Sequence, residues 1–338
     1  GLMRQGETEF VRSIFKELGA ENFLVDGAET EFLAALAGVT DPETKRHRIG
    51  EQFVKVQERI LLTEHFLDGH WILGQGTIYP DTIESGGTAK ADLIKTHHNR
   101  VAGIQALIET GRIIEPLTSF YKDEVREIGR ELGVPAPFLS RHPFPGPGLA
   151  IRCLCSAETA RVRPNEHGYL LPVRSVGVQG DARSYRQVLA LPHPPTLQDI
   201  ATRAPELTNS LAEINRVVAL CGTKSPLTDL ELFAASVTKP RLDLLRQADS
   251  IVREFCIETG FENDVWQFPV VLLPLGTADA RESIVLRPIN SLDGMTADVV
   301  LLDREKLVEL TRRLLMLDGI AGVFYDLTHK PPGTIEWE

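Results

Sequence analysis

The chain has 338 residues and a formal net charge of −11, with 43% hydrophobic and 25% charged residues. This length predicts about two domains with a sizeable core. The negative charge argues against nonspecific binding to nucleic acid or to an anionic membrane surface. No apolar run reaches the roughly 18–20 residues of a membrane span, and the first residues lack a signal-peptide pattern. We therefore expect a cytoplasmic protein with no membrane partner.

The first 150 residues alternate helical patterns with short apolar runs. Apolar residues at helical spacing predict helices over residues 7–18, 29–36, 42–61 and 123–132. Short apolar runs predict strands over residues 22–25, 71–73 and 93–96. This alternation predicts an α/β domain with a parallel sheet, whose ligands lie at the carboxyl ends of the strands.

A stiff loop, 141–148, separates this domain from the next. It holds three prolines and two glycines in eight residues, which suits a clamp for phosphate or a planar base better than a plain connector. Beyond it, two stretches about a hundred residues apart each read as β-rich segment, helix and strand. The stretches are about 168–222 and 268–338, with helices expected over 207–214 and 303–317. The sequence therefore predicts an α+β domain over 151–338 with a weak internal repeat, whose half-open sheets invite pairing.

Glycines and acids follow the strand predicted at 71–73. Gln75 and Gly76 stand in a glycine-rich turn, where a flat base can approach the backbone. Asp81 and Glu84 are three residues apart, so they share a helical face and suit Mg²⁺. As first-turn acids of a helix, the same two residues need no metal, and their spacing alone favours that interpretation.

Basic and histidine-rich segments offer phosphate contacts. Lys95 and the adjacent histidines His97 and His98 lie at the end of the strand predicted at 93–96, where one histidine could orient a phosphate or carry a proton. The two histidines are explained equally well if one is packed and the other is solvated. The basic run 45–48 near a helix N-terminus suits anion capture, although a solvated face is the commoner role of a charge run.

The last nine residues, 330–338, hold two prolines, a glycine, a tryptophan and three ionisable side chains. The prolines fix φ and lower the entropy of the free segment, and Trp337 offers a large apolar anchor. Lys330 and Glu336 then present a cation and an acceptor. That pair suits a ligand with a phosphate at one end and N–H donors at the other. A tail docked only for stability fits the same nine residues.

Taken together, these segments resemble GMP synthases, and the matching strings run in order through nearly the whole chain. The strings are 41–46, 75–85, 94–99, 122–126, 141–149, 175–183 and 330–338. Those at 141–148 and at the C-terminus are the most specific. The long second domain resembles the larger form of the enzyme.

The resemblance implies a ligase that uses ATP and Mg²⁺ to adenylate O2 of xanthosine monophosphate (XMP). Ammonia from a glutaminase domain then displaces AMP and gives GMP. It implies an ATP-pyrophosphatase domain of the adenine nucleotide alpha hydrolase type over 1–150. An XMP-binding and dimerisation domain would follow over 151–338, forming a homodimer or, through the repeat, a pseudo-dimer.

The resemblance also assigns roles to single residues. The XMP contacts implied are Arg46, Asp181, Gln267, Lys330 and Glu336. The adenine contacts implied are Gln75 and Gly76, and the metal ligands considered are Asp81 and Glu84. The phosphate or transition-state contacts implied are Lys95, His98 and Arg141.

Two features of the family are missing from the sequence, its Ser-Gly-Gly-Val-Asp-Ser pyrophosphate loop and its glutaminase domain. Because the first residue is Gly1 rather than Met, we expect the chain to be a piece of a longer protein. On its own it should bind XMP weakly and should not catalyse the reaction. Two alternatives stay open. One is another ATP-pyrophosphatase ligase, such as an NAD or asparagine synthetase, against which the C-terminal tail argues. The other is a noncatalytic dimerisation or regulatory module.

Overall fold

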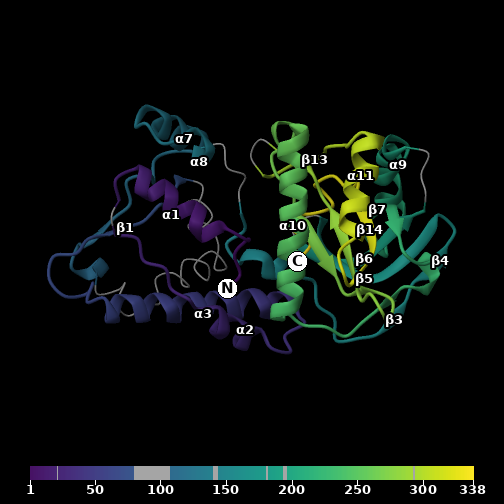
Figure 1. Ribbon diagram of the computed structural model, residues 1–338, viewed down its shortest axis with the longest axis horizontal. Coiled ribbons are helices and arrows are strands. Elements are labelled where there is room, and N and C mark those ends of the chain that lie inside the picture. The colour runs from purple at the N-terminus through teal and green to yellow at the C-terminus, as the bar shows by residue number, and fades with distance from the viewer. Residues whose placement is uncertain (21, 80–106, 140–143, 180–181, 193–195, 292–293) are drawn as a thin grey trace. The chain divides into compact units, whose positions relative to one another are not determined.

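The computed structural model describes residues 1–20, 22–79, 107–139, 144–179, 182–192, 196–291 and 294–338 (Figure 1). The chain is a mixed α/β protein that divides into two compact units. Unit 1 holds Gly1 and residues 6–35 and 47–141, and unit 2 holds residues 2–5, 36–46 and 142–338.

Unit 1 is mostly helical in its described part. Its helices are α1 (Glu7–Glu17), α2 (Glu29–Leu36), α3 (Pro42–Thr63), α7 (Lys122–Glu131) and α8 (Ala136–Leu139), with α2 and α3 reaching into unit 2. Strands β1 (Leu73–Gly74) and β2 (Ile113–Ile114) pair in parallel. A small apolar cluster centred on Leu61 and Leu107 packs beside them.

The structure confirms the four helices predicted in this region. The strand predicted at 71–73 is found as β1, shifted to Leu73–Gly74, with the unpredicted partner β2, and another predicted strand is wrong. Residues 22–25 form no strand, and Leu24 and Val25 are 54% and 43% exposed. An apolar run becomes a strand only when a neighbour takes up its backbone N–H and C=O groups. The strand predicted at 93–96 lies outside the described residues.

Unit 2 is built on a seven-stranded sheet in the order β4-β5-β6-β7-β14-β11-β9. Its strands are β4 (Arg163–Asn165), β5 (Gly168–Gln179), β6 (Ala182–Leu191), β7 (Ile214–Thr223), β9 (Val270–Leu273), β11 (Glu282–Leu286) and β14 (Ile320–Asp326). A second sheet, β10-β8-β3, joins Leu275–Gly276, Glu231–Leu232 and Ala160–Arg161. Strands β12 (Ile289–Asn290) and β13 (Asp298–Val299) form a separate pair.

The two halves of the large sheet have the same order of elements. In the first half, β5 and β6 are antiparallel, and α9 (Leu197–Ser210) connects β6 to the parallel strand β7. In the second half, β9 and β11 are antiparallel, and α11 (Arg304–Leu315) connects β11 to the parallel strand β14. Strands β7 and β14 pair antiparallel at the centre, so the halves are related by an approximate twofold rotation between them.

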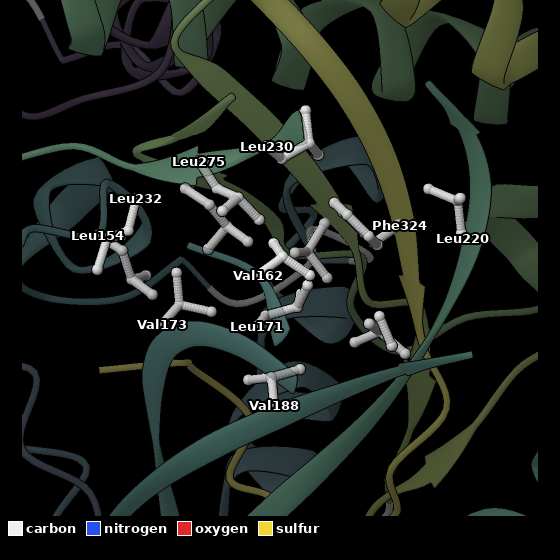
Figure 2. Close-up of a cluster of buried hydrophobic side chains, with 14 of the residues drawn as sticks. Leu154, Val162, Leu171, Val173, Val188, Leu220, Leu230, Leu232, Leu275 and Phe324 are labelled. Atoms are coloured by element: carbon white, nitrogen blue, oxygen red, sulfur yellow. The ribbon is translucent and has the colours of Figure 1, made fainter. Parts of the chain in front are cut away.

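The main core lies on one face of this sheet. Side chains from β5, β6, β7 and β14 meet those of the small sheet in the cluster that Figure 2 shows, which includes Leu171, Val188, Phe324 and Leu232. Because side chains alternate along a strand, neighbours such as Leu189 and Val217 face the other side. There the crossover helices α9 and α11 pack on β7 and β14, and α10 (Lys239–Thr259) packs on β9 (Figure 1).

The helix predicted at 207–214 is wrong in its bounds, whereas the one predicted at 303–317 is confirmed as α11. Helix α9 begins at Leu197, where the Thr196 hydroxyl accepts from the Asp199 N–H as an N-cap. Its buried face, Leu197, Ile200, Ala204 and Leu207, has helical spacing and outweighs Pro205 inside the helix. Ile214 already belongs to β7. Among the described residues, no helix has both the length and the apolarity that crossing a bilayer requires.

Phe324→Ala tests the central core, because Phe324 is fully buried on β14. We expect it to lower the free energy of unfolding by about 3–5 kcal/mol, since the ring's contacts are lost and a cavity remains. Urea denaturation at pH 7 measures this loss. Val308→Ala, at a position 61% exposed, is the control and should change the value by no more than about 0.5 kcal/mol. Equal effects of the two substitutions would contradict the assignment of the core.

Candidate functional site

The last nine residues form a compact turn on strand β5. Lys330–Pro331 and Pro331–Pro332 are both cis peptides. The Val178 N–H donates to the Pro332 oxygen, and the Val176 N–H donates to the Trp337 oxygen, each at 2.8 Å. The two acceptors, Pro332 and Trp337, are five residues apart in the tail, but their donors on β5 are only two residues apart. Residues 333–336 must therefore fold back as a turn. We call residues 330–338 the tail.

A close backbone approach makes this docking possible. Gly177 of β5 pairs with Gly333 of the tail. A Cβ atom on Gly177 would lie 2.9 Å from the Pro332 oxygen and 2.8 Å from the Asn215 amide nitrogen. Any larger residue at position 177 would therefore push the tail away from β5.

A buried charge cluster lies beneath the turn. Oδ2 of Asp326, the last residue of β14, accepts from Arg216 Nη1 and Arg287 Nη1 at 2.7 Å each and from Trp337 Nε1 at 2.9 Å. All four side chains are completely buried. Burial alone would raise the pKa of Asp326, but Arg287 and Arg216 outweigh burial and lower it.

The same two arginines hold the main chain of the tail. Arg216 Nη2 lies 2.9 Å from the Thr334 oxygen, 3.0 Å from the Glu336 oxygen and 3.1 Å from the Val176 oxygen. Arg287 Nε donates to the Ile335 oxygen at 3.0 Å. The Arg216 guanidinium thus lies inside the turn and binds two of its carbonyl groups, and the Arg287 guanidinium binds a third.

The final residue is bound from the first turn of α3, in the part that belongs to unit 2. Lys45 Nζ donates to the Glu338 carboxylate and to the Cys153 oxygen, and Arg46 Nη2 donates to the Glu338 oxygen. Lys45 is 0% and Glu338 3% exposed. Burial would lower the pKa of Lys45, but Glu338 outweighs burial and raises it. Burial raises the pKa of Glu338, which Lys45 offsets only in part.

Glu336 has a buried partner of its own. Arg152 lies at the end of a short 3₁₀ helix, η1 (Gly148–Arg152), directly after the proline-rich loop. Its Nε and Nη2 donate to the two oxygens of Glu336 at 2.9 and 2.7 Å, a bidentate ion pair. The Glu336 side chain is 15% exposed, while that of Arg152 is fully buried.

Positive charge exceeds negative charge among the side chains that hold the tail. The cations are Lys45, Arg46, Arg152, Arg216 and Arg287, and the carboxylates are Asp326, Glu336 and Glu338. Among the described residues, several buried polar atoms in this region have no hydrogen-bond partner. They are Arg46 Nε, Arg152 Nη1, Arg216 Nε, Arg287 Nη2 and Gln267 Oε1. Four of these atoms are guanidinium donors and Gln267 Oε1 is an acceptor, and a buried polar atom without a hydrogen bond is costly.

The structure brings four of the predicted XMP contacts into unit 2. Lys330 is half-buried, and its Nζ donates to the Gly294 oxygen. Gln267 is 6% exposed, and its main chain pairs with Ile289. Arg46 and Glu336 are held as described above. Asp181, the fifth, lies outside the described residues.

The remaining predicted residues are not joined to the tail by any described contact. Gln75 and Gly76 follow β1 in unit 1, where the Gln75 N–H donates to the Ile114 oxygen. The others, namely Asp81, Glu84, Lys95, His98 and Arg141, lie outside the described residues. Within the part of the chain that the structure describes, no group of three or more histidine, cysteine or acidic side chains could hold a metal ion.

Two surface cavities, of about 540 and 460 Å³, lie away from these residues. The first is lined by α10 and by the turn before β14, including Leu244 and Leu317. The second is lined by α2 and α3, including Ala35 and Gln52. Neither is lined by a predicted site residue, whereas the charge cluster around the tail includes Arg46 and Glu336 and is taken as the candidate site.

Five residues of this cluster were missed by sequence reasoning: Lys45, Arg152, Arg216, Arg287 and Glu338. Lys45 stood in the basic run 45–48, which looked like a solvated face. His47 and Arg48 do pair with Glu51 at the surface, but their neighbour Lys45 is buried. Arg216 and Arg287 carried one usable signal, because each interrupts or ends an apolar strand pattern where a charge must find a buried partner.

Comparison with known proteins finds relatives of this chain. Residues 254–337 match the family model described as the GMP synthase C terminal domain. The whole chain aligns at 42% identity with a probable glutamine-hydrolysing GMP synthase of Leptospira interrogans and at 36% with the Streptomyces coelicolor enzyme. A probable GMP synthase of Caenorhabditis elegans is 32% identical over 90% of this chain. The chain spans 58%, 51% and 53% of these three relatives.

Asp326→Asn tests the charge cluster and its dependence on pH. At pH 7 we expect a loss of roughly 3–5 kcal/mol of unfolding free energy, because two buried guanidiniums lose their shared carboxylate. The pKa of Asp326 is lowered in the folded state from its ordinary 3.8. Its contribution is therefore complete above about pH 4 and is lost as the pH falls through the folded-state pKa.

Urea denaturation at several pH values would measure the difference between the two proteins. That difference should be largest near neutral pH and shrink toward pH 2. Asp298→Asn is the matched control, since Asp298 is 87% exposed and pairs only with His329 among the contacts described. A difference that stays constant from pH 7 to pH 2 would contradict the role given to the Asp326 charge.

Proposed function

We propose that this chain is part of a protein of the GMP synthase family, as its relatives and the matching family model support, and that unit 2 binds XMP through the tail. The partly buried cations Arg46 and Lys330 and the Glu336 carboxylate lie on or against the ordered tail, and this set is the observation that carries the proposal. A nucleotide monophosphate offers a phosphate to the cations and N–H donors to the carboxylate. Cations held in fixed positions in a partly buried site bind phosphate strongly.

Each predicted contact then receives a role from its surroundings. Lys330 binds the phosphate as a point charge at one end of the turn. Glu336, at the other end, accepts N–H donors of the purine. The buried Oε1 of Gln267 lacks a partner and accepts from a hydroxyl or N–H group of the ligand. Arg46 and Asp181 complete the set, with Asp181 assigned from the family resemblance alone.

We further propose that the parent protein performs the reaction of its family. ATP adenylates O2 of the xanthine base with loss of pyrophosphate, and ammonia from glutamine then displaces AMP. Unit 1 would supply an ATP-pyrophosphatase domain, with Gln75 and Gly76 beside the adenine. The residues assigned to phosphate contacts and transition-state stabilisation are Lys95, His98 and Arg141. Asp81 and Glu84 would hold Mg²⁺, which neutralises the departing pyrophosphate.

The arrangement of the large sheet favours a pseudo-dimer within one chain. Strand β7 of the first half already pairs with β14 of the second half. The edge that a partner chain would otherwise cover is therefore occupied by the chain itself. We propose that the first half takes the place of a partner subunit, and that no second chain is needed to complete this sheet.

Lys330→Ala should weaken XMP binding by roughly tenfold or more, because a charged hydrogen bond of this kind contributes about 1.5–3 kcal/mol. Isothermal titration calorimetry of the chain with XMP measures the change. Lys224→Ala is the matched control. Lys224 also follows a central strand and precedes a proline by two residues, but it is exposed and donates to the Leu317 oxygen. Unchanged XMP affinity in Lys330→Ala would refute the role of the tail.

Sedimentation equilibrium tests the pseudo-dimer. At high micromolar concentration the chain should behave as a monomer of 37.4 kDa, since β7 and β14 satisfy each other. The measurement is made with and without XMP, so that association driven by the ligand is detected. A stable dimer without ligand would contradict the proposal and indicate that another surface, such as the outer edge of β4 or β9, pairs between chains.

A further inference from the structure

Arg152 differs from the other cations around the tail in what it binds. Arg216 and Arg287 donate to main-chain oxygens of residues 334–336, and Lys45 holds the final residue. The backbone on both sides of Glu336 is therefore fixed without any contribution from Arg152. Arg152 donates only to the Glu336 carboxylate among the described hydrogen bonds, so its effect falls on the direction of that one side chain.

Arg152 is backed by an aromatic ring that a second arginine also contacts. Its guanidinium carbon lies 5.8 Å from the centre of the Phe144 ring, and that of Arg4 lies 4.6 Å from the same ring. Arg4 in turn pairs with Asp249, a buried residue of α10. Burial would lower the pKa of Arg152, but Glu336 and then Asp249 outweigh it and raise it, so the guanidinium stays charged. The fork that faces Glu336 is thus anchored to helix α10 through two further residues.

A bidentate guanidinium also determines what the carboxylate has left to offer. The fork takes one acceptor site on each oxygen and leaves the others, because an ionised carboxylate has about four lone-pair sites. Arg152 is completely buried, whereas the Glu336 side chain keeps 15% exposure. The fork therefore holds the carboxylate in one orientation and leaves acceptor sites on both oxygens unused.

We propose that Arg152 is the positioning residue for recognition of the purine base: it fixes the Glu336 carboxylate so that its free lone pairs receive N–H donors of the bound base. The inference rests on the proposed function, in which Glu336 contacts the base. It adds a residue that touches no part of the ligand. This role also explains why η1, which follows the proline-rich loop, is joined to the tail by the Arg152–Glu336 ion pair.

Arg152→Lys tests this role, because lysine keeps the charge and loses the fork. We expect XMP affinity, measured by calorimetry on the full chain, to fall about ten- to a hundredfold. Affinity for ribose 5-phosphate, which carries the phosphate and sugar without a base, should stay within about twofold, because Lys330 and the backbone of the tail remain in place. Combining Arg152→Lys with Glu336→Gln should cause no loss beyond that of Glu336→Gln alone.

Arg161→Lys is the matched control, since Arg161 pairs with Glu231 but is 80% exposed, and its XMP affinity should not change. Phe144→Leu gives a second test that keeps both charges and removes the ring behind Arg152. It should lower XMP affinity severalfold and leave ribose 5-phosphate binding unchanged, and it decides the question if Arg152→Lys fails to fold.

The outcomes separate this inference from the proposed function. If Glu336→Gln leaves XMP affinity unchanged, the assignment of Glu336 to the base fails, and the role of Arg152 fails with it. If Glu336→Gln weakens XMP binding while Arg152→Lys does not, only the positioning role is overturned. Equal losses for XMP and ribose 5-phosphate in Arg152→Lys would show that Arg152 merely holds the tail, which also overturns the proposal.

Discussion

The structure of unit 2 depends on one buried carboxylate. Asp326 ends β14 in the second half of the sheet, and it accepts from Arg216 of β7 in the first half and from Arg287 just after β11. The indole of Trp337 donates to the same oxygen. Two guanidiniums buried together repel each other, and only the shared carboxylate makes their burial tolerable. The pairing of the two halves and the docking of the tail therefore form one cooperative unit, in which neither is complete without Asp326.

The tail is held by its backbone and by its apolar anchor. Its backbone is held from below by Arg216 and Arg287, and its apolar anchor, Trp337, is fully buried in the main core. Lys330 and Glu336 are thus presented on a segment whose ordering entropy has been lost during folding. A ligand that meets preorganised groups loses less of its binding energy to ordering the protein. The same contacts that stabilise the fold thereby prepare the site.

Sequence patterns predicted the features that depend on near neighbours. Helical spacing located α1, α2, α3, α7 and α11 but not α8, and the composition of the tail indicated Trp337 as its apolar anchor, which is buried. Features that depend on distant partners were not predicted. Lys45 pairs with Glu338, 293 residues away, and nothing in the run 45–48 distinguishes it from its solvated neighbours. Residues 22–25 failed as a strand for the converse reason, since an apolar run does not reveal whether a partner strand is present.

The segments that follow the two central strands, β7 and β14, are held in different ways. After β7 the chain continues from Lys224 into the small sheet, where Leu230 and Leu232 join the main core. After β14 the chain continues into the tail, where Trp337 joins the same core. The first segment is held by apolar burial and by the pairing of β8 with β10 and β3. The second segment is held by ion pairs, which cost more desolvation than apolar contacts but fix direction as well as position. Directional contacts would suit the site proposed for a charged nucleotide, and the buried arginines around the tail come from η1, from β7 and from the residue after β11.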